Sequence, residues 1–358
     1  MKLAMLAPPW LPVPPTGYGG IELVVAQLAD GLAARGNDVL LFAPGDSQTR
    51  AHLLPLVPAS VGQDYPLPIK EAWMFATAHY AYARAALDGA VLIHDHLRLA
   101  SDIDVDLPVI HTLHGPADGR NADGVTFAEV CRQASGRNRS EFYVAISHRQ
   151  RELYGEAGIN WAGTVHNAVD LAMAPFRATK DDYLFFIGRA NWEKGLDLAV
   201  RVAGRAGKRL VMAVKMTEEH EREYYRRHVE PWTDQIAIEL LGEITPQEKF
   251  ALYSKAQGTL FTSQWEEPFG LVMIESLACG TPVIALGRGA APEVIRDGET
   301  GYLCSDEDEM VAAVSKLSAI DPHRCREDMA QNFSIDHMAA GYEAAYAHVL
   351  ACTGAAQK

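Results

Sequence analysis

Two glutamates separated by seven residues are candidates for binding a polyol. They lie in Ser-Gln-Trp-Glu-Glu-Pro-Phe-Gly-Leu-Val-Met-Ile-Glu, residues 263–275, directly after an apolar run that predicts a strand. Glu275 falls in the second turn of an otherwise apolar predicted helix, where a carboxylate is costly without a partner. A ribose would give it two hydroxyl donors, and Glu267, ahead of the helix, could reach a second polyol. The structural alternative is a capping carboxylate and a buried ion pair.

A pair of cations follows another predicted strand. That strand ends in Phe-Phe-Ile-Gly-Arg, so Arg189 falls at its carboxyl end, and Lys194 comes five residues later, just before a predicted helix. Ligands of open α/β sheets bind at this edge of the sheet. A diphosphate would satisfy both cations, because charge-assisted hydrogen bonds to phosphate are strong. Without a ligand, the two residues would be solvated surface charges.

A glycine-rich loop precedes a predicted helix near the N-terminus. Gly17, Gly19 and Gly20 follow the first predicted strand. Glycines let the backbone approach a ligand closely, and a helix N-terminus attracts an anion. The loop is not a dinucleotide fingerprint, because Glu22 stands where the third glycine would be, and no Lys-Ser/Thr pair follows as in a Walker loop. A tight turn without a ligand is the structural alternative.

The histidines and aspartates of the N-terminal half indicate no metal site. His111 and His114 end a predicted strand, but two histidines need a further ligand, and no His-Glu-x-x-His arrangement occurs. We expect His111 to be structural and His114, which is followed by glycine, to lie in a loop at the edge of the sheet. Asp102, Asp104 and Asp106 have Asp-x-Asp spacing, but they precede a strand and we interpret them as a solvated loop.

Two successive α/β alternations carry these residues. Continuous apolar runs predict buried parallel strands, and apolar residues at helical spacing predict helices. In the first alternation the expected strands are 2–7, 39–43, 91–93, 109–110 and 142–146, with a helix over 21–33 that Gly36 closes. In the second they are 183–187, 210–214, 238–241, 258–262 and 282–285, with helices over 196–205 and 271–278. A last helix is expected over 335–350.

The predicted fold class is therefore α/β, with two doubly wound, Rossmann-like domains and a cleft between them. The 358 residues exceed what one hydrophobic core usually organises. We expect the first domain to cover residues 1–172 and the second to cover 173–334. A looser pattern at 164–170, Pro175 and the polar residues 179–182 indicate the linker.

Composition and charge exclude several classes of protein. With 48% hydrophobic and 22% charged residues, the chain has an ordinary globular composition. Its net charge of −14 would repel a polyphosphate backbone, so no nucleic-acid partner is expected. Five scattered cysteines form no Cys-x-x-Cys pair, which fits a reducing cytoplasm. No apolar run reaches the roughly 20 residues that span a bilayer, and two early prolines argue against a signal peptide.

Taken in order, these motifs resemble the retaining glycosyltransferases of the GT-B fold, family 4, the glycogen synthase-like group. The glycine loop, the His-Gly at a strand end, the two cations and the two glutamates are followed by Ala-Cys-Gly-Thr-Pro-Val-Ile (278–284) and Pro-Glu-Val (292–294). The resemblance covers nearly the whole chain, although residues 51–107 and 116–140 carry no motif of the family. Residues 167–170, Asn-Ala-Val-Asp, have alanine where the family usually has glycine.

The resemblance implies how a nucleotide-sugar donor would be held. The donor would bind mainly to the second domain, while the helix within 335–358 would return to the first, acceptor-binding domain. The implied donor contacts are Arg189 and Lys194 with the diphosphate, Glu275 with the ribose, Glu267 with the sugar, the backbone of Phe269, Gly270 and Leu271 with phosphate and sugar, and Gly242, Glu243 and Ile244 with the base. The first domain would contribute Gly19 and Gly20 near the diphosphate and His114 beside the reacting carbon. The implied catalytic residues are His114, Arg189, Lys194 and Glu267.

The implied reaction moves a sugar from a UDP-sugar, first of all UDP-glucose, to an acceptor hydroxyl with retention of configuration. No metal and no cofactor are expected, because Arg189 and Lys194 would stabilise the leaving diphosphate. The alternatives are a GDP-mannose-dependent mannosyltransferase, a GT-B nucleotide-sugar 2-epimerase and a nucleotide-sugar-binding module without turnover. Five arginines between residues 132 and 151 are either a solvated face or bind an anionic acceptor, and the net charge of −14 argues against more than weak membrane association.

Overall fold

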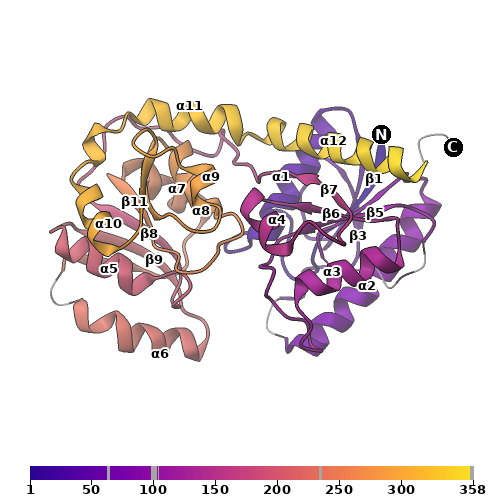
Figure 1. Cartoon of the computed structure of the whole chain (residues 1–358), viewed down its shortest axis with the longest axis horizontal. Coiled ribbons are helices and arrows are strands. Elements are labelled where there is room, and N and C mark those ends of the chain that lie inside the picture. The colour runs from indigo at the N-terminus through magenta and orange to yellow at the C-terminus, as the bar shows by residue number, and fades with distance from the viewer. Residues whose placement is uncertain (63–64, 98–102, 104, 234–235, 355–358) are drawn as a thin grey trace. The chain divides into compact units, whose positions relative to one another are not determined.

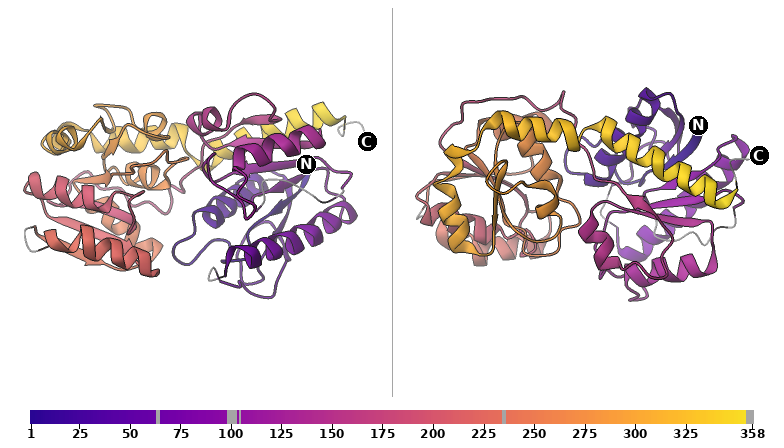
Figure 2. Two further views of the ribbon diagram at one scale, coloured as in Figure 1. Left: turned by 60° about the horizontal axis from the view of Figure 1, so that its bottom comes forward. Right: turned by 45° about the horizontal axis from the view of Figure 1, so that its top comes forward.

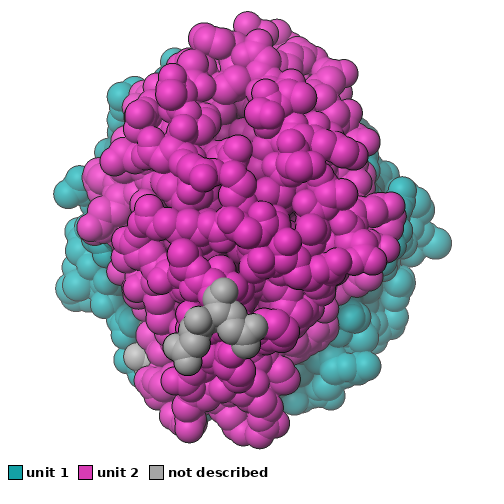
Figure 3. Space-filling view, turned by 90° about the vertical axis from the view of Figure 1, so that its left-hand side faces the viewer, with its two compact units in different colours: residues 1–168, 335–358 teal, residues 169–334 magenta. Residues whose placement is uncertain are grey.

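The computed structural model describes residues 1–62, 65–97, 103, 105–233 and 236–354, which form two compact units (Figures 1 and 3). The first unit contains Met1–Ala168 and the chain from Ile335 onward, and the second is Val169–Ser334. The chain therefore enters the second unit after Ala168, a few residues before the boundary at 172 that the sequence indicates, and leaves it after Ser334.

The first unit is built on a seven-stranded sheet whose strands are all parallel. Its order is β3-β2-β1-β4-β5-β6-β7, with β1 at Lys2–Leu6, β2 at Asp38–Ala43, β3 at His52–Pro55, β4 at Ile93–Asp95, β5 at Val109–Leu113, β6 at Glu141–Ala145 and β7 at Trp161–Thr164. Every residue of β5 and β6 is buried, as expected for strands covered on both faces. The strand order reverses between β1 and β4, and ligands of such sheets bind at this switch point.

Helices surround this sheet, and the last of them comes from the far end of the chain. They are α1 (Gly20–Ala34), α2 (Leu67–Leu87), α3 (Phe127–Arg137), α4 (His148–Tyr154) and α12 (Ile335–Thr353). Helix α12, yellow in Figure 2, buries Tyr342 and Tyr346. The Tyr346 hydroxyl lies 2.7 Å from His94 Nδ1 of β4, and the Tyr342 hydroxyl lies 2.9 Å from Thr112 Oγ1 of β5. These buried polar contacts fix α12 to the sheet of the first unit.

The second unit contains a six-stranded, all-parallel sheet with the order β10-β9-β8-β11-β12-β13. Its strands are β8 (Leu184–Arg189), β9 (Leu210–Lys215), β10 (Ile238–Leu241), β11 (Gly258–Phe261), β12 (Val283–Leu286) and β13 (Gly301–Cys304). Its α-helices are α5 (Leu196–Arg205), α6 (Glu219–His228), α7 (Pro246–Lys255), α8 (Leu271–Ala278), α9 (Ala291–Val294), α10 (Glu307–Val314) and α11 (Pro322–Asn332). The strand order reverses between β8 and β11, so the switch point of this sheet lies where those two strands end.

The predicted bounds of helices and strands agree best with the structure where an apolar run or a helical periodicity is uninterrupted. Helices α5 and α8 and strand β10 have the predicted bounds. The strand predicted at 91–93 instead covers Ile93–Asp95, because hydrogen bonds allow the polar residues His94 and Asp95 to be buried. The sequence does not predict β3, β7 or β13, which are short strands of mostly half-buried residues.

The sequence predicts a solvated loop around three aspartates and no membrane-spanning helix. Of the aspartates interpreted as a solvated loop, Asp102 and Asp104 lie outside the described residues, and Asp106 is exposed. Within the described residues, no helix is both long and apolar enough to span a bilayer.

Candidate active site

The carboxyl ends of β8 and β11 bring Lys194 and Glu267 together at the switch point of the second unit. Lys194 lies in the loop between β8 and α5, and its Nζ is 2.6 Å from Glu267 Oε2 and 2.8 Å from Oε1. The two side chains are only 22% and 12% exposed. The sequence predicts separate contacts of Lys194 with a diphosphate and of Glu267 with a sugar, whereas in the structure the two residues form one ion pair.

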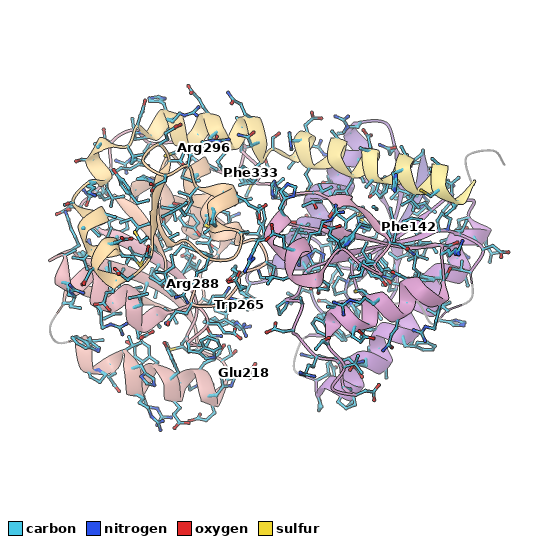
Figure 4. The ribbon with its side chains drawn as sticks, in the orientation of Figure 1. Phe142, Glu218, Trp265, Arg288, Arg296 and Phe333 are labelled. Atoms are coloured by element: carbon cyan, nitrogen blue, oxygen red, sulfur yellow. The ribbon has the colours of Figure 1, made fainter. Side chains whose placement is uncertain are left out.

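Three donors hold the Glu267 carboxylate through the same oxygen. Besides Lys194, Oε2 accepts from Ser263 Oγ at 2.9 Å and from Trp265 Nε1 at 2.8 Å (Trp265 is labelled in Figure 4). Within the described residues, Oε1 accepts from Lys194 alone. One oxygen therefore fixes the orientation of the carboxylate, and the other keeps a lone pair that a ligand hydroxyl can use.

Arg189 ends β8 five residues before Lys194, and within the described residues most of its donors have no hydrogen-bond partner. Its Nη2 lies 3.3 Å from Glu193 Oε2, an oxygen that also accepts from Asn191 Nδ2 at 3.1 Å. Its Nε is buried and has no hydrogen-bond partner among the described residues. A guanidinium has five N–H donors, so Arg189 can bind a second anion without giving up Glu193.

Glycines make the close approach of the site loops possible. Gly195 has φ of +64°, and a Cβ there would lie 2.2 Å from the Thr262 carbonyl oxygen. The Thr262 hydroxyl in turn donates to the Lys194 carbonyl oxygen at 2.9 Å. Gly289, with φ of +54°, packs against the backbone of Glu267, where a Cβ would lie 2.5 Å from both N and O. A side chain at Gly195 would push the loop that carries Lys194 away from Thr262, and a side chain at Gly289 would push the loop after β12 away from Glu267.

The N-terminus of α8 is the third part of this site. Gly270 is its N-cap with φ of +87° and supplies no side-chain cap, so the first N–H groups of the helix lack that partner. The helix begins at Leu271, as the sequence predicts. Phe269 is buried and packs against Phe333 with ring centroids 6.1 Å apart, so only its backbone is suited to a ligand (Phe333 is labelled in Figure 4).

Glu275 has the partner that its place in an apolar helix requires. It is only 4% exposed, and its Oε1 lies 2.5 Å from Lys249 Nζ. The Tyr253 hydroxyl donates to Oε2 at 3.4 Å. Lys249 and Tyr253 are four residues apart on α7 and so share one face of that helix. Lys249 belongs to no motif, so its pairing with Glu275 was not predicted from the sequence.

The residues expected to border the base lie in another loop of the second unit. Gly242, Glu243 and Ile244 form the loop between β10 and α7, and Glu243 is exposed. In the described part of the chain, no hydrogen bond or ion pair links Glu243 or Ile244 to Arg189, Lys194 or Glu267.

The glycine loop of the first unit leads into α1 as expected. Gly19 is the N-cap, and a Cβ there would lie 2.8 Å from Leu11 Cδ1. Gly20 is the first residue of the helix and is exposed. Two residues later, Glu22 is buried at 3% exposure, and burial raises the pKa of its carboxyl group to about 7. The sequence signal for this buried carboxyl group is that Glu22 stands where a dinucleotide-binding loop has its third glycine.

His114 follows β5 and contacts a second histidine, His96, that was not among the residues predicted from the sequence. The ring is half-buried, its Nε2 lies 3.0 Å from His96 Nδ1, and burial lowers the pKa of His114 to about 4. His96 directly follows β4, at the switch point of the first sheet. His111, by contrast, is fully buried and stacks on Tyr143 with ring centroids 5.3 Å apart, so it belongs to the core.

Three of the five arginines in the basic cluster form ion pairs within the first unit. Arg132 pairs with Glu129, Arg149 with Glu152 and Arg151 with Glu156, at 3.2, 3.2 and 2.8 Å. Paired arginines at a solvated surface leave a weaker field for an anionic ligand, which favours the solvated-face interpretation.

Two glycosyltransferase families match successive parts of the chain. Glycosyltransferase Family 4 matches residues 18–173, and Glycosyl transferases group 1 matches residues 172–333. The chain is 27% identical over 355 residues to the glycogen synthase of Mycobacterium tuberculosis, in an alignment that covers 86% of this chain and 84% of that protein.

The chain shares its fold with solved structures, among them a glycosyltransferase. AviGT4, a glycosyltransferase involved in avilamycin A biosynthesis, is 26% identical with a TM-score of 0.70 over 98% of both chains. Anabaena HepE, solved in complex with UDP-glucose, has a TM-score of 0.69 at 17% identity, covering 97% of this chain and 99% of that one. Two Rossmann-like units with parallel sheets, together with these relatives, define a GT-B fold. The chain belongs to the family 4-like glycosyltransferases and is a glycosyltransferase of the GT-B type.

Proposed function

We propose that the protein transfers a sugar from a nucleotide-diphosphate sugar to an acceptor hydroxyl with retention of configuration, and that UDP-glucose is the first donor to test. The observation that carries this proposal is the cluster at the switch point of the second unit. There, Lys194 and Glu267 form an ion pair next to Arg189 and the uncapped N-terminus of α8. The fold shared with HepE, which was solved with UDP-glucose, supports a uridine donor.

The chemistry of this cluster follows from where charge develops. Breaking the bond between the anomeric carbon and the diphosphate places negative charge on the departing oxygen. Arg189, Lys194 and the first N–H groups of α8 are fixed donors that stabilise this charge electrostatically. Two side-chain cations and a helix N-terminus supply the stabilisation that a divalent metal gives elsewhere, so the transfer is proposed to need no metal.

The two glutamates recognise the sugars of the donor. Glu275 accepts hydrogen bonds from the ribose hydroxyls, and Glu267 uses its free lone pair on Oε1 for a hydroxyl of the transferred sugar. The backbone of Phe269, Gly270 and Leu271 borders the phosphate and the sugar. The proposed contacts of Glu243 and Ile244 with the base, of Gly19 and Gly20 with the diphosphate and of His114 with the sugar remain predictions.

Release of nucleoside diphosphate from four donors tests this function. We expect purified protein to cleave UDP-glucose faster than UDP-N-acetylglucosamine, UDP-galactose or GDP-mannose. Fastest release of GDP would identify a mannosyltransferase. Conversion of a UDP-sugar into its 2-epimer would identify an epimerase, and tight donor binding with no product would identify a binding module. Either of these last two results would overturn the proposed transfer.

A further inference from the structure

Three histidine rings lie side by side where β4 and β5 end. His94 and His96 have ring centroids 4.0 Å apart, and those of His96 and His114 are 5.3 Å apart. Both ring nitrogens of His94 are engaged, because Nδ1 lies 2.7 Å from the Tyr346 hydroxyl and Nε2 lies 2.7 Å from Thr112 Oγ1. His94 is therefore held by α12 and β5, and it supports the His96 ring from one side.

One shared proton decides the tautomers of His96 and His114. His96 Nδ1 and His114 Nε2 are 3.0 Å apart, so one nitrogen donates and the other accepts. Burial lowers the pKa of both rings below its ordinary range, so neither carries a charge near neutral pH. Either His96 Nδ1–H donates to His114 Nε2, or His114 Nε2–H donates to His96 Nδ1.

The environment of His96 Nε2 distinguishes the two possible directions of the hydrogen bond between His96 and His114. His96 is only 3% exposed, and its Nε2 is buried without a hydrogen-bond partner among the described residues. If His114 donates, the proton of His96 must sit on Nε2 as a buried N–H group without an acceptor. If His96 donates, Nε2 carries only a lone pair. Orphaned buried N–H groups are rarer in proteins than under-satisfied acceptors, which favours donation by His96.

We propose that His96 fixes His114 as its Nδ1–H tautomer, so that His114 meets the substrate as a neutral hydrogen-bond donor. No hydrogen bond to His114 Nδ1 forms within the described residues, and the ring is half-buried, so this N–H is free for an oxygen of the transferred sugar. The contact with a sugar rests on the proposed function, whereas the tautomer does not. His96 is a positioning residue in this scheme. A donor at Nδ1 cannot remove a proton, so activation of the acceptor hydroxyl falls to another base.

Nitrogen-15 NMR of histidine-labelled full-length protein tests the tautomer without any donor. In the wild type we expect His114 Nδ1 to have the protonated signature and Nε2 the unprotonated one, and His114→Gln assigns the signals. His96→Asn keeps an N–H donor near the position of Nδ1 and should preserve the pattern. His96→Leu removes the donor and should give a mixture of both tautomers. Wild-type His114 protonated on Nε2 would overturn the proposal, even if the leucine variant does not fold.

Measurements of kcat and Kd on the His96 variants then show whether His96 positions the proton of His114 or only supports the fold. With a donor that the wild type cleaves, His96→Leu should lower kcat up to about tenfold, the scale of one hydrogen bond, and leave the Kd of the free nucleoside diphosphate unchanged. His96→Asn should recover most of kcat. The matched control is His79→Leu, an exposed histidine on α2, which should match the wild type. Equal loss in the leucine and asparagine variants would contradict a role for the donated proton. A protein that shows the Nδ1–H tautomer but cleaves no donor would refute the proposed function and leave the tautomer intact.

Discussion

The Glu267 carboxylate shows how a site can be fixed before its ligand arrives. Lys194, Ser263 and Trp265 all donate to Oε2, so the carboxylate cannot rotate without losing several hydrogen bonds. Lys194 is thereby held beside Arg189 at the end of β8. Preorganised charges of this kind need no rearrangement during the reaction, which is why they lower a barrier more than mobile surface charges do.

Replacing either cation should therefore affect turnover more than donor binding. We expect Arg189→Ala and Lys194→Ala each to lower kcat by roughly a hundredfold, the usual effect of removing one preorganised electrostatic partner. Donor affinity should fall less, because the bridging oxygen gains its charge only as the bond breaks. The double variant should lose less than the two single losses combined, since both cations act on one diphosphate. Steady-state kinetics on the four proteins measure this, and wild-type turnover with weakened affinity would instead indicate a binding clamp.

The pair of Glu275 and Lys249 should govern recognition of the ribose. Hydrogen bonds to a charged group contribute about 1.5–3 kcal/mol, so Glu275→Gln should weaken binding of UDP roughly tenfold or more. Lys249→Met should have a similar effect, because it removes the cation 2.5 Å from the carboxylate. The matched control is Lys255→Met, an exposed lysine at the end of the same helix. Calorimetry measures the affinity of each variant for free UDP. Unchanged affinity in Glu275→Gln would show that Glu275 does not bind the ribose.

At the scale of elements, the sequence predicted the central strands and the helices that carry the motifs. Helices α5 and α8 could be predicted because their apolar residues recur at helical spacing. The edge strands β3 and β7 could not, since their half-buried residues leave no apolar run. The candidate residues after β8 and β11 were identifiable from their motifs, but their pairing was not. It depends on two loops meeting at Gly195 and Thr262, a tertiary contact that no local pattern encodes.

Residues without a motif escaped prediction for the same reason. His96 and Lys249 gain their roles only because β4 lies next to β5 and α7 packs against α8. A single histidine or lysine in the sequence carries no information about such a neighbour.

Glu22 at the start of α1 should give the stability of the protein a distinct pH dependence. Its pKa rises from 4.5 to about 7 on folding, so between these values the folded chain binds its proton more tightly than the unfolded chain. The free energy of unfolding should therefore fall as pH rises through this window. Glu22→Gln removes this titration. Between pH 5 and pH 8 the free energy of unfolding of the wild type should therefore fall by about 2–3 kcal/mol more than that of the variant.

Urea unfolding at the two pH values measures this difference. The matched control is Glu152→Gln, since Glu152 is 67% exposed and its replacement should follow the wild-type pH profile. Parallel profiles for wild type and Glu22→Gln would show that the carboxyl group titrates normally in the folded protein.

At the scale of the whole molecule, the chain crosses between its two units twice, and the second crossing completes the first unit. Helix α12 brings Tyr342 and Tyr346 to Thr112 and His94, next to the His96–His114 pair. Helix α12 thus supports a candidate site through a residue, Tyr346, that lies 252 positions after His94 in the sequence. The net charge of −14 is unfavourable for an anionic donor, so the proposed function requires the local cations of the second unit to attract it.

Donor cleavage in the presence of EDTA tests the central claim most directly, that side-chain cations at the switch point of the second unit stabilise the leaving diphosphate. The test compares wild type, the double variant Arg189→Ala, Lys194→Ala and the control Lys208→Met, Arg209→Ala. The control removes two cations beside the amino end of β9, where they pair with Asp182 and Glu239. We predict that wild type and control release UDP from UDP-glucose at equal rates in EDTA, and that the double variant is at least about a hundredfold slower. Loss of wild-type activity in EDTA with recovery on adding Mn²⁺, or a double variant as active as its control, would contradict this claim.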